Sequence, residues 1–134
     1  MSSSGNKRFG GIDLGGTKLA VGAFSDEGDM LHMESIPLAG RSGAAVGELI
    51  AGQIAKLGAN HGCSATGVCI PGLYRAQAGT VWAPNIPGWD DYPLCDELNA
   101  AAGPSHPVTI DSDRAACILG ETWRGSARGA SDAI

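Results

Sequence analysis

The sequence predicts an α/β domain in which a mixed five-stranded sheet carries helices on its faces, in the order βββαβαβα. Short apolar segments typical of strands alternate with longer segments that have helical periodicity. Glycine is also frequent, at 21 of 134 residues, which indicates many tight turns or close backbone approaches. With 43% hydrophobic and 17% charged residues, the chain has the balance of one globular domain with a core of its own.

The first three strands are expected at residues 9–14, 19–24 and 30–36. The second of them alternates Leu19, Val21 and Ala23 with smaller or exposed positions, as a strand with one buried face does. A polar turn at residues 25–29 joins it to the third strand. The start of the chain therefore predicts a three-stranded antiparallel meander.

A helix is expected over residues 41–58, followed by a strand at residues 65–70. The apolar residues of this helix fall on one face at helical spacing: Val46, Leu49, Ile50, Ile54 and Leu57. Ser42 is the expected N-cap of the helix, and Gly58 with Asn60 is the expected stop.

After the fourth strand, residues 73–87 carry glycine and proline in the pattern of an excursion or hairpin. A short helix at residues 93–102, a fifth strand at 108–111 and a helix at 112–124 follow. Residues 131–134 have the pattern of the start of another strand. We therefore expect this sequence to be a truncated piece of a longer protein.

Charge and hydropathy exclude several classes of partner. The net charge of −5 argues against nucleic acid, because phosphate backbones are bound with lysine and arginine. No apolar run approaches the roughly 20 residues of a membrane span, so no membrane is expected as a partner. Residues 1–8 are polar and lack the apolar centre of a signal peptide, so we expect a cytoplasmic protein.

The cysteines and histidines predict no metal or redox centre. No pair of the four cysteines has the Cys-x-x-Cys spacing, and Cys69 and Cys117 lie in apolar stretches typical of buried positions. His32, His61 and His106 are isolated in the sequence and are expected at the surface.

A candidate phosphate-binding turn lies between the first two strands. Gly15 and Gly16 permit positive φ angles and leave bare backbone N–H groups for a phosphate, and Thr17 adds a hydroxyl before Lys18. Asp13, at the end of a strand, can hold hydrated Mg²⁺. The spacing is not that of a Walker A loop, since a strand rather than a helix follows. A plain β-hairpin with a Gly-Gly turn is the alternative.

The first phosphate motif of the ROK family is similar to the segment Gly11-Ile12-Asp13-Leu14-Gly15-Gly16-Thr17-Lys18-Leu19-Ala20. That family contains bacterial glucokinases, related hexose and N-acetylhexosamine kinases, and sugar-responsive repressors. The resemblance continues in the expected order through residues 67–72, 82–89, 108–121 and 126–134. It covers nearly the whole chain, which makes it far more specific than any single motif.

The resemblance implies the ribonuclease H-like fold of actin, hexokinase and Hsp70. Residues 1–134 would then be the N-terminal sugar-binding and first phosphate domain of an ATP-dependent hexose kinase. The ATP-binding domain, with the second phosphate motif and the family's zinc site, would lie beyond residue 134. The 134 residues alone are expected to show no kinase turnover and to expose apolar surface where that domain packs.

The resemblance also implies a sugar site. Asp113 takes the position of the general base, and Ser112 stands where the family has an asparagine that binds sugar hydroxyls. Gly72 and Asn85 match positions that approach the sugar. For the segment around Asp113 the alternative is a helix cap, and capping is compatible with catalysis. Asp111 is expected to be structural.

Other residues near this site are open to two interpretations. Gly72 and Asn85 can instead be turn residues beside prolines. Trp82 and Trp89 could stack on a pyranose, but packing is favoured for both. Ser112 in place of asparagine, and Arg114 where a small residue is usual, put sugar affinity in doubt.

The resemblance further implies Mg-ATP as cofactor and a hexose or N-acetylhexosamine as substrate, and a homodimer of the full-length parent is compatible with it. The alternative function is a non-catalytic sugar-binding regulator or a degenerate remnant of the family. Family repressors carry a DNA-binding helix-turn-helix ahead of the first strand, and about eight residues are too few for one.

Overall fold

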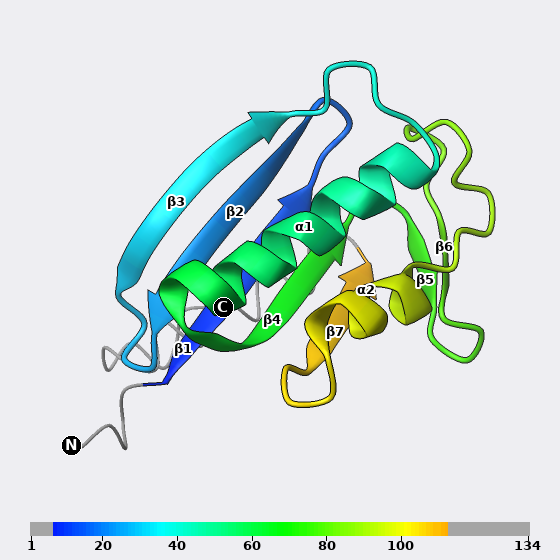
Figure 1. The fold of residues 1–134 in the computed structure, drawn as a ribbon. Coiled ribbons are helices and arrows are strands. Elements are labelled where there is room, and N and C mark those ends of the chain that lie inside the picture. Colours follow the sequence, from blue (N-terminus) through cyan, green and yellow to red (C-terminus); the bar gives the residue numbers. More distant parts are fainter. Residues whose placement is uncertain (1–6, 113–134) are drawn as a thin grey trace, which may run out of the picture.

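The computed structural model describes residues 7–112, which form one mixed sheet, two helices and a small hairpin (Figure 1). In chain order the elements are β1 (Arg8–Leu14), β2 (Lys18–Ser25), β3 (Met30–Pro37), α1 (Ala44–His61), β4 (Cys63–Ile70), β5 (Leu73–Arg75), β6 (Thr80–Trp82), α2 (Leu94–Ala102) and β7 (Val108–Ser112). The strand order across the large sheet is β3-β2-β1-β4-β7, and β5 pairs with β6 separately. Neither helix in this part of the chain is long and apolar enough to cross a membrane.

The predicted meander is confirmed, because β1 pairs with β2 and β2 with β3 in antiparallel register. β4 returns parallel to β1 after α1, and β7 lies parallel to β4. The register of β2 and β3 shifts between Ala23 and Phe24, where one residue of β3, Leu31, has no partner on β2. The strands β1, β4 and β7 therefore end at the same edge of the sheet.

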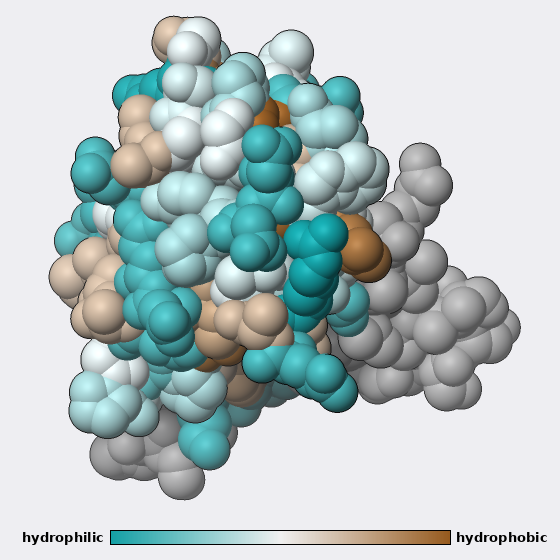
Figure 2. All heavy atoms as spheres, turned by 90° about the vertical axis from the view of Figure 1, so that its right-hand side faces the viewer, coloured by the Kyte–Doolittle hydropathy of each residue, from teal (hydrophilic) through white to brown (hydrophobic). Residues whose placement is uncertain are grey.

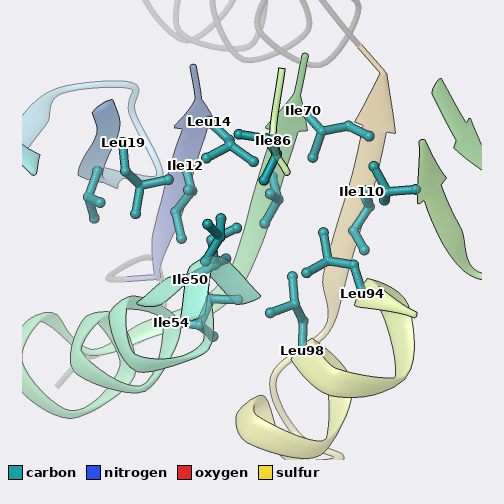
Figure 3. Packing of buried hydrophobic residues seen from close by; sticks show 14 of the residues in the cluster. Ile12, Leu14, Leu19, Ile50, Ile54, Ile70, Ile86, Leu94, Leu98 and Ile110 are labelled. Carbon is teal, nitrogen blue, oxygen red and sulfur yellow. The ribbon is translucent and has the colours of Figure 1, made fainter. Parts of the chain in front are cut away.

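The hydrophobic core lies between the sheet and the two helices, which cover the same face (Figure 3). Ile12 and Leu14 of β1 point toward α1, whose Ile50 and Ile54 are fully buried. Full burial of a side chain of this size contributes about 1.5–3 kcal/mol. The helical spacing of α1 predicted that Ile50 and Ile54 lie on one apolar face.

The ends of α1 differ from those predicted. The helix begins at Ala44 after Gly43, without a side-chain cap, so the prediction of Ser42 as N-cap is wrong. It continues through Gly58 and Asn60 and ends at Gly62, which takes a left-handed φ of 67° and donates its N–H to the Leu57 carbonyl. Gly62 supplies the left-handed conformation that ends a helix. The expected stop, Gly58 with Asn60, lies inside the helix instead.

The two helices approach each other closely at Gly47 of α1. A β-carbon there would overlap the Tyr92 hydroxyl and the Glu97 carboxylate, which share a hydrogen bond of 2.5 Å. Burial and the Glu97 carboxylate raise the pKa of Tyr92, so its hydroxyl remains a donor. The Tyr92 ring also stacks on Trp89 with centroids 4.6 Å apart.

The segment after β4 was expected to be an excursion or a hairpin, and the structure has a hairpin there. Trp89 is fully buried, so the prediction of packing holds for it. Trp82 is 42% exposed, so that prediction is wrong for Trp82. On the side of the molecule that carries the hairpin, hydrophilic and moderately hydrophobic residues are mixed rather than gathered into one apolar patch (Figure 2).

Other predictions have mixed outcomes. Cys69 is buried as expected, whereas the prediction that His106 lies at the surface is wrong: it is buried and shares a 2.8 Å hydrogen bond with Thr66. Ser112 ends β7 instead of beginning a helix. The rest of the expected helix at residues 112–124, with Cys117, lies outside the described residues.

Candidate functional site

Residues from three distant segments meet at the edge where β1, β4 and β7 end. Asp13 on β1 lies beside Cys69 on β4, which in turn lies beside Asp111 on β7. Ser112, the last residue of β7, is the register partner of Ile70. Open α/β sheets bind ligands at the carboxyl ends of their parallel strands, so this edge is the expected place for a site. Asp113 follows Ser112 and lies outside the described residues.

The turn between β1 and β2 is tight. Gly15 donates its N–H to the Lys18 carbonyl at 2.9 Å. Neither Gly15 nor Gly16 lies in the left-handed region, so the turn does not use the positive φ that these glycines permit. Within residues 7–112 the N–H groups of Gly16 and Thr17 donate to no partner. Two adjacent free N–H groups can serve as donors to an anion.

The loop that carries Asn85 lies against this turn. A β-carbon at Gly16 would lie 3.9 Å from the β-carbon of Asn85. The two segments border an open hollow of about 310 Å³. Its lining residues are Gly16, Thr17, Leu38, Ala39, Gly40, Arg41, Asn85, Ile86 and Pro87. The structure therefore brings together one residue predicted to bind sugar and two predicted to bind phosphate.

Hydrogen bonds hold the Asn85 loop in place. Ala83 donates its N–H to the Trp89 carbonyl at 2.8 Å, which closes the loop at its base. The Trp89 indole N–H donates to the Gly43 carbonyl at 3.0 Å, and the Gly43 N–H donates to Pro87 at 2.7 Å. The buried indole thus fixes the loop to the start of α1.

Gly72 and Ser112 both attach the β5–β6 hairpin to the sheet edge. A β-carbon at Gly72 would overlap the carbonyl oxygen of Trp82 and lie 2.8 Å from the Ala83 Cα. The Ser112 hydroxyl accepts the N–H of Tyr74 at 2.6 Å. The close approach that requires glycine at position 72 is therefore to protein backbone. Ser112 keeps its own O–H proton to donate.

Two further acidic residues have distinct surroundings. Asp111 accepts the N–H of Ser112 at 2.7 Å, which agrees with a structural role. Asp13 is exposed at the end of β1. No group of three or more histidine, cysteine, aspartate or glutamate side chains within the described residues could hold a metal. A single exposed carboxylate fits Mg²⁺, which takes one or two carboxylates together with phosphate oxygens and waters.

Arg41 is a site residue that the sequence did not reveal. It was expected to start a helix, but it precedes α1 and lines the hollow. Its Nη1 donates to the carbonyl oxygens of Pro37 and Leu38, at 3.1 and 3.0 Å. No motif includes it, and only the fold of the segment between β3 and α1 places it beside the glycine turn.

Comparison with known proteins gives a consistent result. The chain matches the model of the ROK family over residues 9–134. A glucokinase from Thermotoga maritima is 34% identical over 121 residues, which cover 89% of this chain and 38% of the enzyme. An N-acetyl-D-glucosamine kinase from Vibrio parahaemolyticus is 33% identical over 114 residues, with 84% of this chain and 37% of the enzyme covered.

Solved structures agree with these matches. The ROK hexokinase of Thermus thermophilus superimposes with a TM-score of 0.74 at 33% identity, over 91% of this chain and 40% of that one. A ROK family glucokinase from Streptomyces griseus, solved with glucose and AMPPNP, superimposes with a TM-score of 0.73 at 28% identity. The match covers 88% of this chain and 37% of that one. This chain spans less than half of the length of each of these proteins.

Proposed function

Because the chain belongs to the ROK family, we propose that it is the sugar-binding and first phosphate-binding part of an ATP-dependent hexose kinase. One observation carries the proposal: Gly16 and Thr17, whose N–H groups have no partner within residues 7–112, line the same hollow as Asn85. A phosphate and a sugar held there would lie next to each other. Glucose is the first substrate to test, since several relatives are glucokinases, and N-acetylglucosamine is the second.

The sugar is held by the Asn85 amide and the hydroxyl of Ser112, with the backbone at Gly72 close to a sugar hydroxyl. Asp113 accepts the proton of the attacking hydroxyl, which requires a carboxylate within about 2.6–3.2 Å of it. These roles for Asp113 and Ser112 rest on the resemblance of residues 110–116 to the family's motif.

Gly16 and Thr17 bind phosphate oxygens through their N–H groups, Gly15 shapes the turn, and Lys18 adds a nearby positive charge. Asp13 holds hydrated Mg²⁺. Mg-ATP, when bound, supplies the phosphoryl group. Phosphoryl transfer depends mainly on positioning and on charge neutralisation, and these residues provide both on the sugar side. The adenosine-binding residues belong to the part of the relatives that this chain does not span.

Binding of sugar to the ¹⁵N-labelled chain, followed by NMR, tests the proposal. Glucose or N-acetylglucosamine is expected to shift the amide signals of Gly72, Asn85 and Ser112. Asn85→Ala should abolish these shifts because it removes the amide that binds the hydroxyls. Asn60→Ala is the matched control, since Asn60 is exposed in the last turn of α1.

The 134-residue chain is expected to form no sugar phosphate from ATP and glucose, because one domain cannot enclose both substrates. Absence of any shift with either sugar would reject the proposed sugar site. That outcome would favour a non-catalytic remnant of the family.

A further inference from the structure

The outer side of β3 is an open edge of the large sheet. β3 is the last strand in the order β3-β2-β1-β4-β7, and within residues 7–112 it pairs only with β2 (Figure 1). Met30, Leu31 and Met33 along this strand are about half exposed. We propose that two copies of the chain pair antiparallel through this edge, with Met33 on the two-fold axis. The sheet of one copy then continues into the sheet of the other.

The hydrogen bonds next to β3 determine which of its backbone groups face outward. The Leu38 N–H donates to the Thr17 carbonyl at 2.9 Å, which continues the register of β2 and β3 by one residue beyond Pro37. Hydrogen-bonded and non-hydrogen-bonded pairs alternate along an antiparallel ladder. Counting back from Leu38, Met33 and Ser35 occupy non-hydrogen-bonded positions, so their N–H and C=O groups point away from β2.

The position of Pro37 agrees with this assignment. It falls in the same outward row as Met33 and Ser35, where the missing N–H removes no hydrogen bond to β2. The outward groups of Met33 and Ser35 have no partner strand in the described part of the chain. A second strand that lies alongside β3 supplies donors and acceptors for them, as strand addition does at other open edges.

The side chains of β3 favour a second copy of β3 as that strand. In an antiparallel pair centred on Met33, His32 of each copy lies opposite Glu34 of the other, in positions where facing side chains are closest. Within one chain the His32 Nε2 lies 3.2 Å from the Glu34 carboxylate, so both side chains are on the same face of the sheet. An imidazole that donates and a carboxylate that accepts are complementary across the pair.

Other registers of the same pair are less favourable. A pair centred on Glu34 places two carboxylates directly opposite each other, and like charges in that position destabilise a sheet. A pair centred on Ser35 places Met33 opposite Pro37, which has no N–H to donate. The register centred on Met33 avoids both faults. It also brings the two exposed Met33 side chains together, which removes apolar surface from water.

The paired stretch is limited at both ends. The register of β2 and β3 shifts at the unpaired Leu31, and Pro37 ends the outward row of donors at the other end. Small interfaces are typical of weak and transient complexes. The dimer is therefore expected to be reversible and to depend on concentration.

Sedimentation of the 134-residue chain over a range of concentrations tests the proposal. The unmodified chain is expected to pass from monomer to dimer as its concentration rises. Met33→Lys should weaken association about tenfold, because two like charges then meet at the axis and the apolar contact is lost. Leu73→Lys is the matched control, since Leu73 is as exposed as Met33 but lies on β5. It should leave association unchanged.

A charge swap tests the register. His32→Glu should weaken association, because it places two carboxylates opposite each other in each of the two facing pairs. Adding Glu34→Lys to this variant should restore association, since opposite charges then face each other again with their signs exchanged. In a register centred on Glu34 the second change would instead place two ammonium groups together. Circular dichroism establishes that each variant is folded.

Amide hydrogen exchange locates the interface without any substitution. The N–H groups of Met33 and Ser35 point outward, so they should exchange quickly in dilute solution and slowly in concentrated solution. The N–H of Glu34 points toward β2 and should be protected at both concentrations.

A chain that remains monomeric at every concentration would overturn the proposal. A dimer that persists undiminished in a folded Met33→Lys chain would do so too, as would one that leaves the amides of Met33 and Ser35 unprotected. Dissociation by Leu73→Lys in place of Met33→Lys would move the interface to the hairpin. Failure of Glu34→Lys to restore association would overturn the pairing of His32 with Glu34.

Discussion

At the scale of single residues, the position of the β5–β6 hairpin beside the site depends on how closely Gly72 approaches the backbone of Trp82 and Ala83. A β-carbon there meets the Trp82 carbonyl and Ala83, and backbone atoms cannot turn aside as a side chain can. Gly72 thus lets β4 lead directly into the hairpin, whose second strand ends just before the Asn85 loop. The residue acts on the site through the position of that loop.

We expect Gly72→Ala to lower the free energy of unfolding by about 2 kcal/mol, as overpacking against fixed atoms does. Urea unfolding followed by circular dichroism measures this change. Gly67→Ala on β4 is the matched control, because a β-carbon at Gly67 has no atom within 4 Å. Equal stability of the two variants would show that the hairpin moves freely away from Gly72.

The sequence singled out Asp13 and Gly16 from a local motif and Asn85 from the family resemblance, and Gly16 and Asn85 lie beside each other in the structure. It could not find the roles of Ser112 and Arg41 in the structure. The hydrogen bond from Tyr74 to Ser112 joins residues 38 positions apart, and no local pattern encodes such a contact. Arg41 resembles an ordinary surface residue until the chain folds.

At the scale of elements, the contact between α1 and α2 helps to position the loop that carries Asn85. Gly47 brings the two helices together where Tyr92 and Glu97 share their hydrogen bond. Tyr92 stacks on Trp89, whose indole binds the start of α1. A change in the helix contact is therefore transmitted to the loop that carries Asn85.

Two glycine variants in α1 should change stability in opposite directions. Gly47→Ala should lower the free energy of unfolding by about 1–3 kcal/mol, because the stacked Tyr92 ring cannot yield easily. Gly52→Ala should raise it by about 1 kcal/mol, since Gly52 is exposed with no atom within 4 Å of its β-carbon and alanine favours the helix. Denaturant titration of both variants measures the changes. A stabilising Gly47→Ala would contradict the tight contact.

The helix itself was predictable from its apolar spacing, but its ends were not. Gly58 with Asn60 was the expected stop, but Gly62 is the residue that takes the left-handed conformation at the end of the helix. A β-carbon at Gly58 would lie 3.5 Å from the His106 ring, so the last turn packs on the loop before β7. Tertiary contact, which the sequence does not display, thus sets where the helix ends.

At the scale of the whole molecule, His106 links stability to pH. The ring is buried, it shares a hydrogen bond with Thr66 of β4, and burial lowers its pKa below the usual 6.5. The folded state therefore favours the neutral ring. The stabilisation is complete above about pH 6.5 and is lost as the pH falls from there toward the folded-state pKa.

We expect the free energy of unfolding to fall between about pH 7 and pH 5, and His106→Asn to reduce this slope. Urea unfolding across that range is the measurement. His32→Asn is the control, because His32 lies on β3 and pairs with the exposed Glu34. An unchanged slope in His106→Asn would assign the pH dependence to other groups.

The topology of the whole sheet was largely predictable. The order of strands and helices follows from periodicity and turn residues, and the resemblance to a known family added the fold. The burial of His106 was not predictable, because an isolated histidine beside a proline is typical of a surface loop. Its neighbours Thr66 and Gly58 are brought to it only by the completed sheet and α1.

The register shift in β3 shortens the regular part of the open edge of the sheet. Within the described residues β3 pairs only with β2, so its other side is an open strand edge that exposes Met30, Leu31 and Met33. Open edges of this kind invite strand addition and aggregation. Here the unpaired Leu31 bends one end of the strand, and Pro37 lacks an N–H at the other. The straight stretch between them is short, so the edge is a poor template for a growing fibril.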